Sequence, residues 1–138
     1  MSKIVIVGAG KTGRGFLARL LQEAEKEVVF VDKNKELVDD LNADKEFQVR
    51  FFGGVRETYT VNNFVAYTWE NEEVKEVLEK DAELIFVSVG GQNLKDVGAE
   101  LAKVLDGDKM YYIITAENAS KPSQHKSARQ QSQLYFII

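Results

Sequence analysis

The chain has 138 residues, the size of one domain, of which 44% are hydrophobic and 29% charged. This composition is typical of a soluble globular protein and not of a disordered chain. Cysteine is absent and His125 is the single histidine, which excludes disulfides, a thiolate nucleophile and sulfur-bound metals and predicts no metal site. The net charge of −4 argues against nucleic acid or an anionic membrane as a partner. No apolar run is long enough to cross a bilayer, so we expect a cytoplasmic protein that binds a small molecule.

Short β-branched runs alternate with segments of helical period through the first 118 residues, a pattern typical of βαβ units around a parallel sheet. We therefore expect an α/β fold, a Rossmann-type doubly wound parallel sheet. In chain order the predicted strands are residues 4–7, 28–31, 64–67, 83–89 and 110–115, and the predicted helices lie near residues 16–24, 35–41, 72–80 and 94–105.

One segment interrupts this alternation. Residues 47–52 and 55–61 flank Gly53-Gly54, and paired glycines supply the positive φ that tight turns need. The sequence therefore predicts a β-hairpin insertion at about residues 47–61.

The composition changes near the end of the chain. Residues 120–133 are rich in Ser, Gln, Lys and Ala, hold the only proline and have no acidic residue, which indicates a loosely held segment. We therefore expect a domain over residues 1–119 and a polar tail over residues 120–138. The tail ends in five apolar residues, which we expect to cover another surface or to mediate self-association, and these are Leu134, Tyr135, Phe136, Ile137 and Ile138.

A glycine-rich motif follows the first predicted strand and opens the first predicted helix. Its glycines are Gly8, Gly10 and Gly13. In such a motif the first permits a tight turn, the second lets a pyrophosphate approach the backbone, and the third lets helix and strand pack closely. The alternative is a strand-to-helix turn without a ligand. We favour dinucleotide binding, with the phosphate-proximal residues Ala9, Lys11, Thr12 and Arg14 included in the predicted site.

An acidic residue follows the second strand. Asp32 ends this strand 22 positions after Gly10, where a carboxylate accepts hydrogen bonds from the adenosine ribose hydroxyls. A 2′-phosphate would meet its negative charge, so the sequence favours NAD over NADP, although the neighbouring Lys33 softens that repulsion. The alternative is an aspartate that only begins the next turn.

The fourth predicted strand ends at the same edge of the sheet in Val89, Gly90 and Gly91. Ligands of open α/β folds lie at this edge, so we include these three residues in the predicted cofactor site. A flexible link into a helix capped by Asn93 is an equally open interpretation.

The run Gly8-Ala9-Gly10-Lys11-Thr12-Gly13-Arg14-Gly15-Phe16 resembles the N-terminal signature of the mannitol-1-phosphate 5-dehydrogenases, which belong to the polyol-specific long-chain dehydrogenase family. Asp32-Lys33-Asn34, Phe47-Gln48-Val49 and Ala116-Glu117-Asn118 agree with it in register, so the resemblance covers about residues 3–118. It implies an NAD-binding domain of an oxidoreductase that transfers hydride between mannitol 1-phosphate and fructose 6-phosphate. It also makes Asn118 a candidate beside the substrate, although a helix cap or turn asparagine is an alternative.

Two departures from the family follow. Ala116 stands where members usually have Cys, and members continue into a long helical catalytic domain that supplies a catalytic lysine. We therefore expect residues 120–138 to be the truncated start of that domain, no catalytic residue in this chain, and cofactor binding without useful turnover. A sugar-phosphate substrate is expected only where the catalytic domain is present.

A second function class fits the length. A stand-alone nucleotide-sensing domain, similar to the regulatory Rossmann domains of potassium channels and transporters, would also carry a glycine motif and an acidic residue after the second strand. Such domains generally lack the Gly-Arg-Gly-Phe extension and the hairpin, which favours the dehydrogenase interpretation. A third possibility is a remnant used only for assembly through its apolar end.

Overall fold

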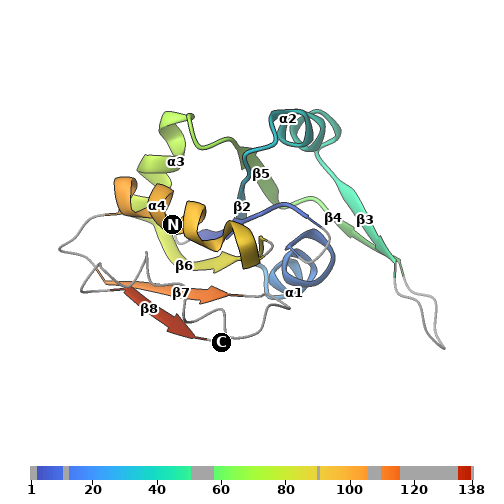
Figure 1. Ribbon diagram of the computed structural model, residues 1–138. Helices are drawn as coiled ribbons and strands as arrows, with labels where there is room; N and C mark the ends of the chain where they lie inside the picture. The colour runs from blue at the N-terminus through green and yellow to red at the C-terminus, as the bar shows by residue number, and fades with distance from the viewer. Residues whose placement is uncertain are drawn as a thin grey trace.

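The computed structural model describes residues 3–10, 13–50, 58–89, 91–105, 110–115 and 134–137. Its main element is a six-stranded parallel sheet in the order β5-β2-β1-β6-β7-β8 (Figure 1). The strands are β1 (Lys3–Val7), β2 (Val28–Val31), β5 (Phe64–Tyr67), β6 (Ala82–Val87), β7 (Tyr111–Thr115) and β8 (Leu134–Ile137). The predicted parallel α/β sheet is confirmed, because its order is that of the doubly wound dinucleotide-binding fold.

The centre of the sheet is β1, which pairs in parallel with β2 on one side and β6 on the other. Val7 stands opposite Val31 of β2 and Val87 of β6, so the three strands end level with one another. The chain first builds outward through β2 and β5 and then crosses back to β6. This reversal of strand order leaves a crevice at the carboxyl ends of the strands, the usual position of a ligand in such folds.

Helices cover both faces of the sheet, as a doubly wound fold requires. They are α1 (Ala18–Glu23) preceded by the π-helical turn η1 (Gly13–Leu17), α2 (Lys35–Asp44), α3 (Glu72–Glu76) continued by the π-helical turn η2 (Val77–Asp81), the 3-10 turn η3 (Gly91–Asn93), and α4 (Leu94–Val104). The single helix predicted over residues 72–80 is therefore an α-helix that widens into a π turn. Both parts face the core, through Val74 of α3 and through Val77 and Leu78 of η2.

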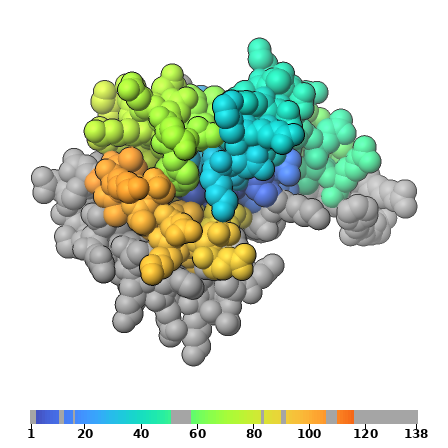
Figure 2. Space-filling view, turned by 45° about the horizontal axis from the view of Figure 1, so that its top comes forward, coloured from blue at the N-terminus to red at the C-terminus, as the bar shows by residue number. Residues whose placement is uncertain are grey.

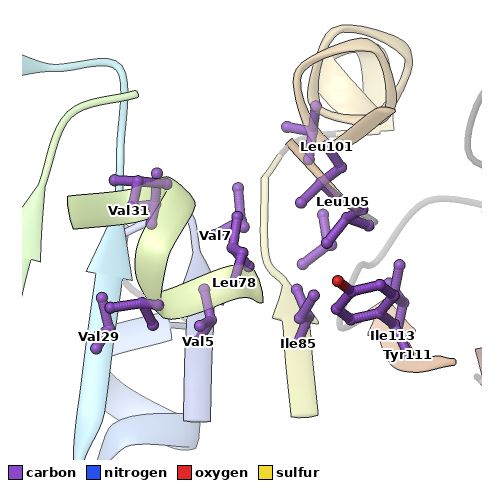
Figure 3. Close-up of a cluster of buried hydrophobic side chains, with 14 of the residues drawn as sticks. Val5, Val7, Val29, Val31, Leu78, Ile85, Leu101, Leu105, Tyr111 and Ile113 are labelled. Carbon is purple, nitrogen blue, oxygen red and sulfur yellow. The ribbon is translucent and has the colours of Figure 1, made fainter. Parts of the chain in front are cut away.

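Two apolar cores result, one on each face. Alternate residues of a strand point to opposite faces, so Val5 and Val7 of β1 join the core beneath α3, η2 and α4, while Ile6 joins the core beneath α1 and α2. Figure 3 shows the first core, in which Leu78 of η2 and Leu101 of α4 pack over the apolar side chains of the strands.

The predicted hairpin insertion is confirmed as a separate two-stranded antiparallel sheet of β3 (Phe47–Arg50) and β4 (Thr58–Val61). Its proposed Gly53-Gly54 turn lies outside the described residues. The hairpin is held by α1, because the Gln22 side chain donates to the Thr60 carbonyl oxygen at 2.5 Å and accepts from the Asn62 N–H at 2.7 Å. The insertion is thus fixed to the body of the domain by polar contacts as well as by the second core.

Helix α2 also protects the outer edge of the main sheet. It is capped by Asn34, whose side chain accepts from the Leu37 N–H at 3.2 Å. Farther along, Asn42 donates to the Ala66 carbonyl oxygen at 2.8 Å and accepts from the Ala66 N–H at 3.0 Å. Since β5 is an edge strand, this side chain takes the place of a neighbouring strand and satisfies backbone groups that would otherwise be unpaired.

At the opposite edge, β8 pairs in parallel with β7, with Tyr111 opposite Leu134 and Ile114 opposite Ile137. The apolar end of the chain therefore meets a surface, as predicted, and that surface is the edge of the chain's own sheet. Most of the predicted tail, residues 120–133 and 138, lies outside the described residues. Self-association through residues 134–138 stays a prediction.

Candidate functional site

The first glycine of the motif stands where β1 ends between its two neighbours. Gly8 has a φ of 101°, a left-handed conformation that favours glycine. A Cβ atom at this position would lie 2.1 Å from the Ser88 carbonyl oxygen. The Gly8 N–H donates to the Val31 carbonyl oxygen at 2.8 Å, so the turn is tied to the end of β2 while it passes closely beside the end of β6.

The third glycine brings the first helix against this turn. A Cβ atom on Gly13 would lie 2.3 Å from the carbonyl oxygen of Gly8, so only glycine permits the close contact between helix and strand that the motif predicts. Gly10 differs, because a Cβ atom there would meet no atom within 4 Å. Gly10 is exposed and faces open space, which is the geometry needed where a ligand approaches the backbone.

Asp32 joins this loop to the end of β2. One carboxylate oxygen accepts from the Ala9 N–H at 2.8 Å, and the other accepts from the Asn34 N–H at 2.8 Å. The Asp32 N–H donates to the Tyr67 carbonyl oxygen at 3.0 Å, which fixes the residue beside β5. Two carboxylate oxygens offer about four acceptor positions, so these two contacts leave acceptor positions on the side chain.

A pocket of about 660 Å³ opens at the crevice between the strand ends. Its wall is formed by the glycine loop, the end of β2, the turn after β5, the end of β6 and the first turns of α4. Figure 2 shows the surface of α2 in cyan, of α3 in yellow-green and of α4 in yellow to orange. The lining residues are Val7, Gly8, Gly10, Val31, Asp32, Lys33, Trp69, Glu70, Ser88, Val89, Asn93, Asp96, Val97 and Glu100. A pocket of this volume is large enough for a nucleotide-sized ligand.

The turn after β5 contributes residues that the sequence analysis did not single out. Trp69 is the only tryptophan of the chain; it is half-buried, packs against the first core and lines the pocket. The neighbouring residue is Glu70. Hydrogen bonds from the Glu70 backbone N–H and from the Thr68 side chain lower the pKa of the Glu70 carboxyl group. Glu70 is thus an ionised acceptor at neutral pH.

The end of η3 and the start of α4 contribute further lining residues that were not predicted for the site, which are Asn93, Asp96, Val97 and Glu100. Their spacing of three and four residues places them on one side of the helix. Their helical spacing was the only sequence feature that could have indicated them. Acidic residues at this spacing are equally typical of a solvent-exposed helix face. Asn93 stands at the N-cap position of α4, but its side chain makes no cap hydrogen bond there.

The turn that carries Trp69 and Glu70 is closed by Tyr67 and Glu73, whose hydroxyl and carboxylate form a 2.6 Å hydrogen bond. Burial, followed by the hydrogen bond and negative charge of Glu73, raises the pKa of Tyr67 to about 12. An unfolded tyrosine ionises near pH 10. Between about pH 10 and 12 the unfolded chain therefore loses this proton while the folded chain keeps it, and the contribution of Tyr67 to the free energy of unfolding falls with rising pH.

We expect Glu73→Gln to lower the pKa of Tyr67, because it removes the carboxylate that the hydroxyl contacts. The measurement is a spectrophotometric pH titration of tyrosinate absorbance. The ionisation step that occurs at the highest pH in the unmodified chain should move to lower pH in this variant. Glu72→Gln is the matched control, since Glu72 is exposed in the same turn of α3. Coincident titration curves for Glu73→Gln and the unmodified chain would contradict the assignment.

The predicted site residues fall into three groups. Five of them line the pocket, namely Gly8, Gly10, Asp32, Lys33 and Val89. Three support or flank it: Ala9 is buried and donates to Asp32, Gly13 seats the helix, and Arg14 is half-buried, its Nε without a hydrogen-bond partner among the described residues. Lys11, Thr12, Gly90 and Asn118 lie outside the described residues, and Gly91 begins η3.

No described helix is long and apolar enough to span a membrane. In that part of the chain, no group of three or more acidic or histidine side chains is arranged to hold a metal ion.

Comparison with known families matches residues 2–129 to the mannitol dehydrogenase Rossmann domain. The chain belongs to this family. The mannitol-1-phosphate 5-dehydrogenase of Thermoanaerobacter pseudethanolicus is 39% identical over 124 residues, which are 86% of this chain and 32% of that protein. The Rossmann domain described here thus spans about a third of the length of this relative.

Solved structures agree on the fold. The glycerol-3-phosphate dehydrogenase of Coxiella burnetii superposes with a TM-score of 0.67 at 18% identity, over 98% of this chain and 39% of that one. The TrkA-N domain of an inner membrane protein of Escherichia coli gives a TM-score of 0.53 at 18% identity, over 98% of this chain and 87% of that one. Family and fold together imply a nicotinamide cofactor, and the open approach at Gly10 with the acceptor Asp32 beside it fits such a group.

Proposed function

We propose that this domain binds NAD(H) as the cofactor-binding part of a dehydrogenase of the mannitol-1-phosphate 5-dehydrogenase type. The observation that carries the proposal is a glycine turn that opens directly onto a pocket with a carboxylate at its side. When bound, NAD accepts or donates the hydride, while the protein supplies binding and orientation.

Different residues of the chain would bind different parts of the dinucleotide. The pyrophosphate would lie on the backbone of the loop from Gly8 to Gly13, where Gly10 leaves room for its approach. Lys11, Thr12 and Arg14 flank that position in the sequence. Asp32 would accept hydrogen bonds from the ribose hydroxyls through the acceptor positions that Ala9 and Asn34 leave open.

The preference for NAD over NADP is part of the proposal. A 2′-phosphate carries about −1.5 to −2 charges near neutral pH, and it would lie beside the Asp32 carboxylate at the end of β2. Lys33 also lines the pocket and is exposed, so it offsets part of this repulsion. The preferred cofactor is therefore NAD.

The reaction is proposed from the family. Mannitol 1-phosphate and fructose 6-phosphate would be the pair that exchanges hydride with NAD, and Asn118 would lie beside the substrate. Because the domain matches only about a third of the length of its relative, we expect the 138 residues alone to bind cofactor without useful turnover. The proposed location is the cytoplasm.

A regulatory nucleotide sensor is the second candidate. It is suggested by the superposition of this chain with 87% of a TrkA-N domain. Its expected ligand differs in kind, because such a sensor can prefer ATP.

A calorimetric titration with NADH, NADPH and ATP in one buffer tests the proposal. We expect NADH to bind at least about tenfold more tightly than NADPH, because one contact between like charges at short range weakens binding by about this factor. Tighter binding of ATP than of either dinucleotide would favour the sensor. Absence of binding by all three would contradict both functions. Rapid oxidation of mannitol 1-phosphate by the 138-residue chain would contradict the expected lack of turnover.

A further inference from the structure

The pocket carries more negative charge than the single carboxylate that the motif predicts. Glu70, Asp96 and Glu100 line it in addition to Asp32, and we name these three residues the acidic wall. Lys33 is the single cationic residue among the described lining residues. Four carboxylates and one ammonium group give the pocket a formal charge of −3.

The acidic wall comes from two separate elements. Glu70 belongs to the turn after β5 and is fixed there by its own backbone and the Thr68 side chain. Asp96 and Glu100 are four residues apart on α4, where like charges disfavour a helix. Glu100 has an ion pair with Lys103 at 3.2 Å. Glu100 is half-buried and Lys103 is largely exposed, so this pair neutralises only part of the negative charge.

The size of the pocket makes these charges act together. A volume of about 660 Å³ corresponds to a width close to the screening length of about 8 Å at physiological ionic strength. A phosphate held in the pocket is therefore only partly screened from the lining carboxylates. Low-dielectric walls formed by Val7, Val31 and Val97 concentrate that field inside the pocket.

The repulsion of a phosphate by Asp32 is partly offset by its surroundings. Its two oxygens each accept a backbone N–H at 2.8 Å, and these dipoles offset part of its charge. Lys33 stands next to it in the same pocket and would attract a phosphate. Further negative charge in the pocket would therefore add to the exclusion of a 2′-phosphate by Asp32.

We propose that the acidic wall is a second determinant of cofactor choice, which excludes the 2′-phosphate of NADP independently of Asp32. This inference rests on the proposed binding of NAD(H). It assigns cofactor specificity to α4 and to the turn after β5, two elements outside the glycine motif and the end of β2.

Four proteins test it: the unmodified chain, Asp32→Asn, the triple variant Glu70→Gln/Asp96→Asn/Glu100→Gln, and the variant with all four changes. Each amide keeps the size of the carboxylate it replaces and removes its charge. The measured quantity is the ratio of the Kd for NADPH to the Kd for NADH, by calorimetry, with circular dichroism as a check of folding. A triple variant in exposed residues outside the pocket, Asp40→Asn/Asp44→Asn/Glu46→Gln, is the control for net charge.

We expect the wall variant to lower the ratio on the order of tenfold, since each removed charge contributes a few-fold at about 8 Å in water-like surroundings. Asp32→Asn should keep a preference for NADH, and the fourfold variant should lose it. The control should keep the ratio of the unmodified chain. Raising the salt concentration should lower the ratio of the unmodified chain more than that of the wall variant.

Two results would overturn the inference and leave the proposed function intact. They are an unchanged ratio in the wall variant, and complete loss of NADH preference in Asp32→Asn alone. Failure of the unmodified chain to bind NADH would overturn the proposed function and this inference together.

Discussion

Gly8→Ala is expected to lower the free energy of unfolding by about 3 kcal/mol or more, since a strained left-handed backbone and an overpacked contact each cost about 1–3 kcal/mol. Gly8 has a φ of 101°, and its new Cβ atom would lie 2.1 Å from the Ser88 carbonyl oxygen. This oxygen belongs to the backbone at the end of β6, so it has little freedom to move. Urea unfolding followed by circular dichroism measures the change.

Gly13→Ala is expected to cost about 1–3 kcal/mol by the same overpacking, because its Cβ atom would lie 2.3 Å from the carbonyl oxygen of Gly8. Gly15→Ala is the matched control. No atom lies within 4 Å of its Cβ position, and Gly15 has no positive φ. Equal stability of Gly8→Ala and Gly15→Ala would contradict the turn geometry described for Gly8.

Gly10→Ala is expected to weaken NADH binding by at least about tenfold while it leaves the free energy of unfolding within about 0.5 kcal/mol, the usual range for an exposed substitution. The new methyl group would meet no protein atom within 4 Å. It would occupy space in the pocket where the second glycine of such a motif lets a pyrophosphate approach. Calorimetry gives the affinity, and urea unfolding gives the stability.

Gly15→Ala again serves as the control, because Gly15 lies in η1, shortly after the glycine loop, and does not line the described pocket. It should bind NADH with the affinity of the unmodified chain. An unchanged Kd in Gly10→Ala would mean that the cofactor does not approach the loop at this residue, and the proposed position of the pyrophosphate would then be wrong.

The fold was predictable because its signals are local. Buried β-branched runs such as residues 4–7 alternate with helical periods, and parallel strands with helical crossovers follow from that alternation. The hairpin followed from paired glycines between two strand-like runs. The π turn η2 was not predictable, since apolar spacing at Val74, Val77 and Leu78 fits a regular helix equally well.

The site was predictable only where chain position and chemistry coincide. Gly8, Gly10 and Asp32 follow strands whose carboxyl ends meet at one edge of the sheet, so the sequence brings them together. Trp69 and Glu70 also follow a strand, but a turn residue carries no signal for the direction in which it faces. Asp96 and Glu100 have the spacing of a solvated helix face, and only the position of α4 over the crevice makes them pocket residues.

The contact of Asp32 with the Ala9 N–H at 2.8 Å shows what sequence alone omits. The two residues are 23 positions apart, and the hydrogen bond depends on the level ends of β1 and β2. A carboxylate predicted to contact only a ligand also holds the loop that the ligand would occupy. The same residue therefore contributes to the shape of the site and to its charge.

The central claim is that the pocket between the glycine loop, Asp32 and α4 binds NADH. Amide chemical-shift mapping of the ¹⁵N-labelled chain during a titration with NADH tests it most directly. We predict that the largest shifts occur at Gly8, Ala9, Gly10 and Asp32 and at the Trp69 indole, with small shifts in the hairpin strands β3 and β4. Saturable shifts confined to residues outside this pocket would contradict the account.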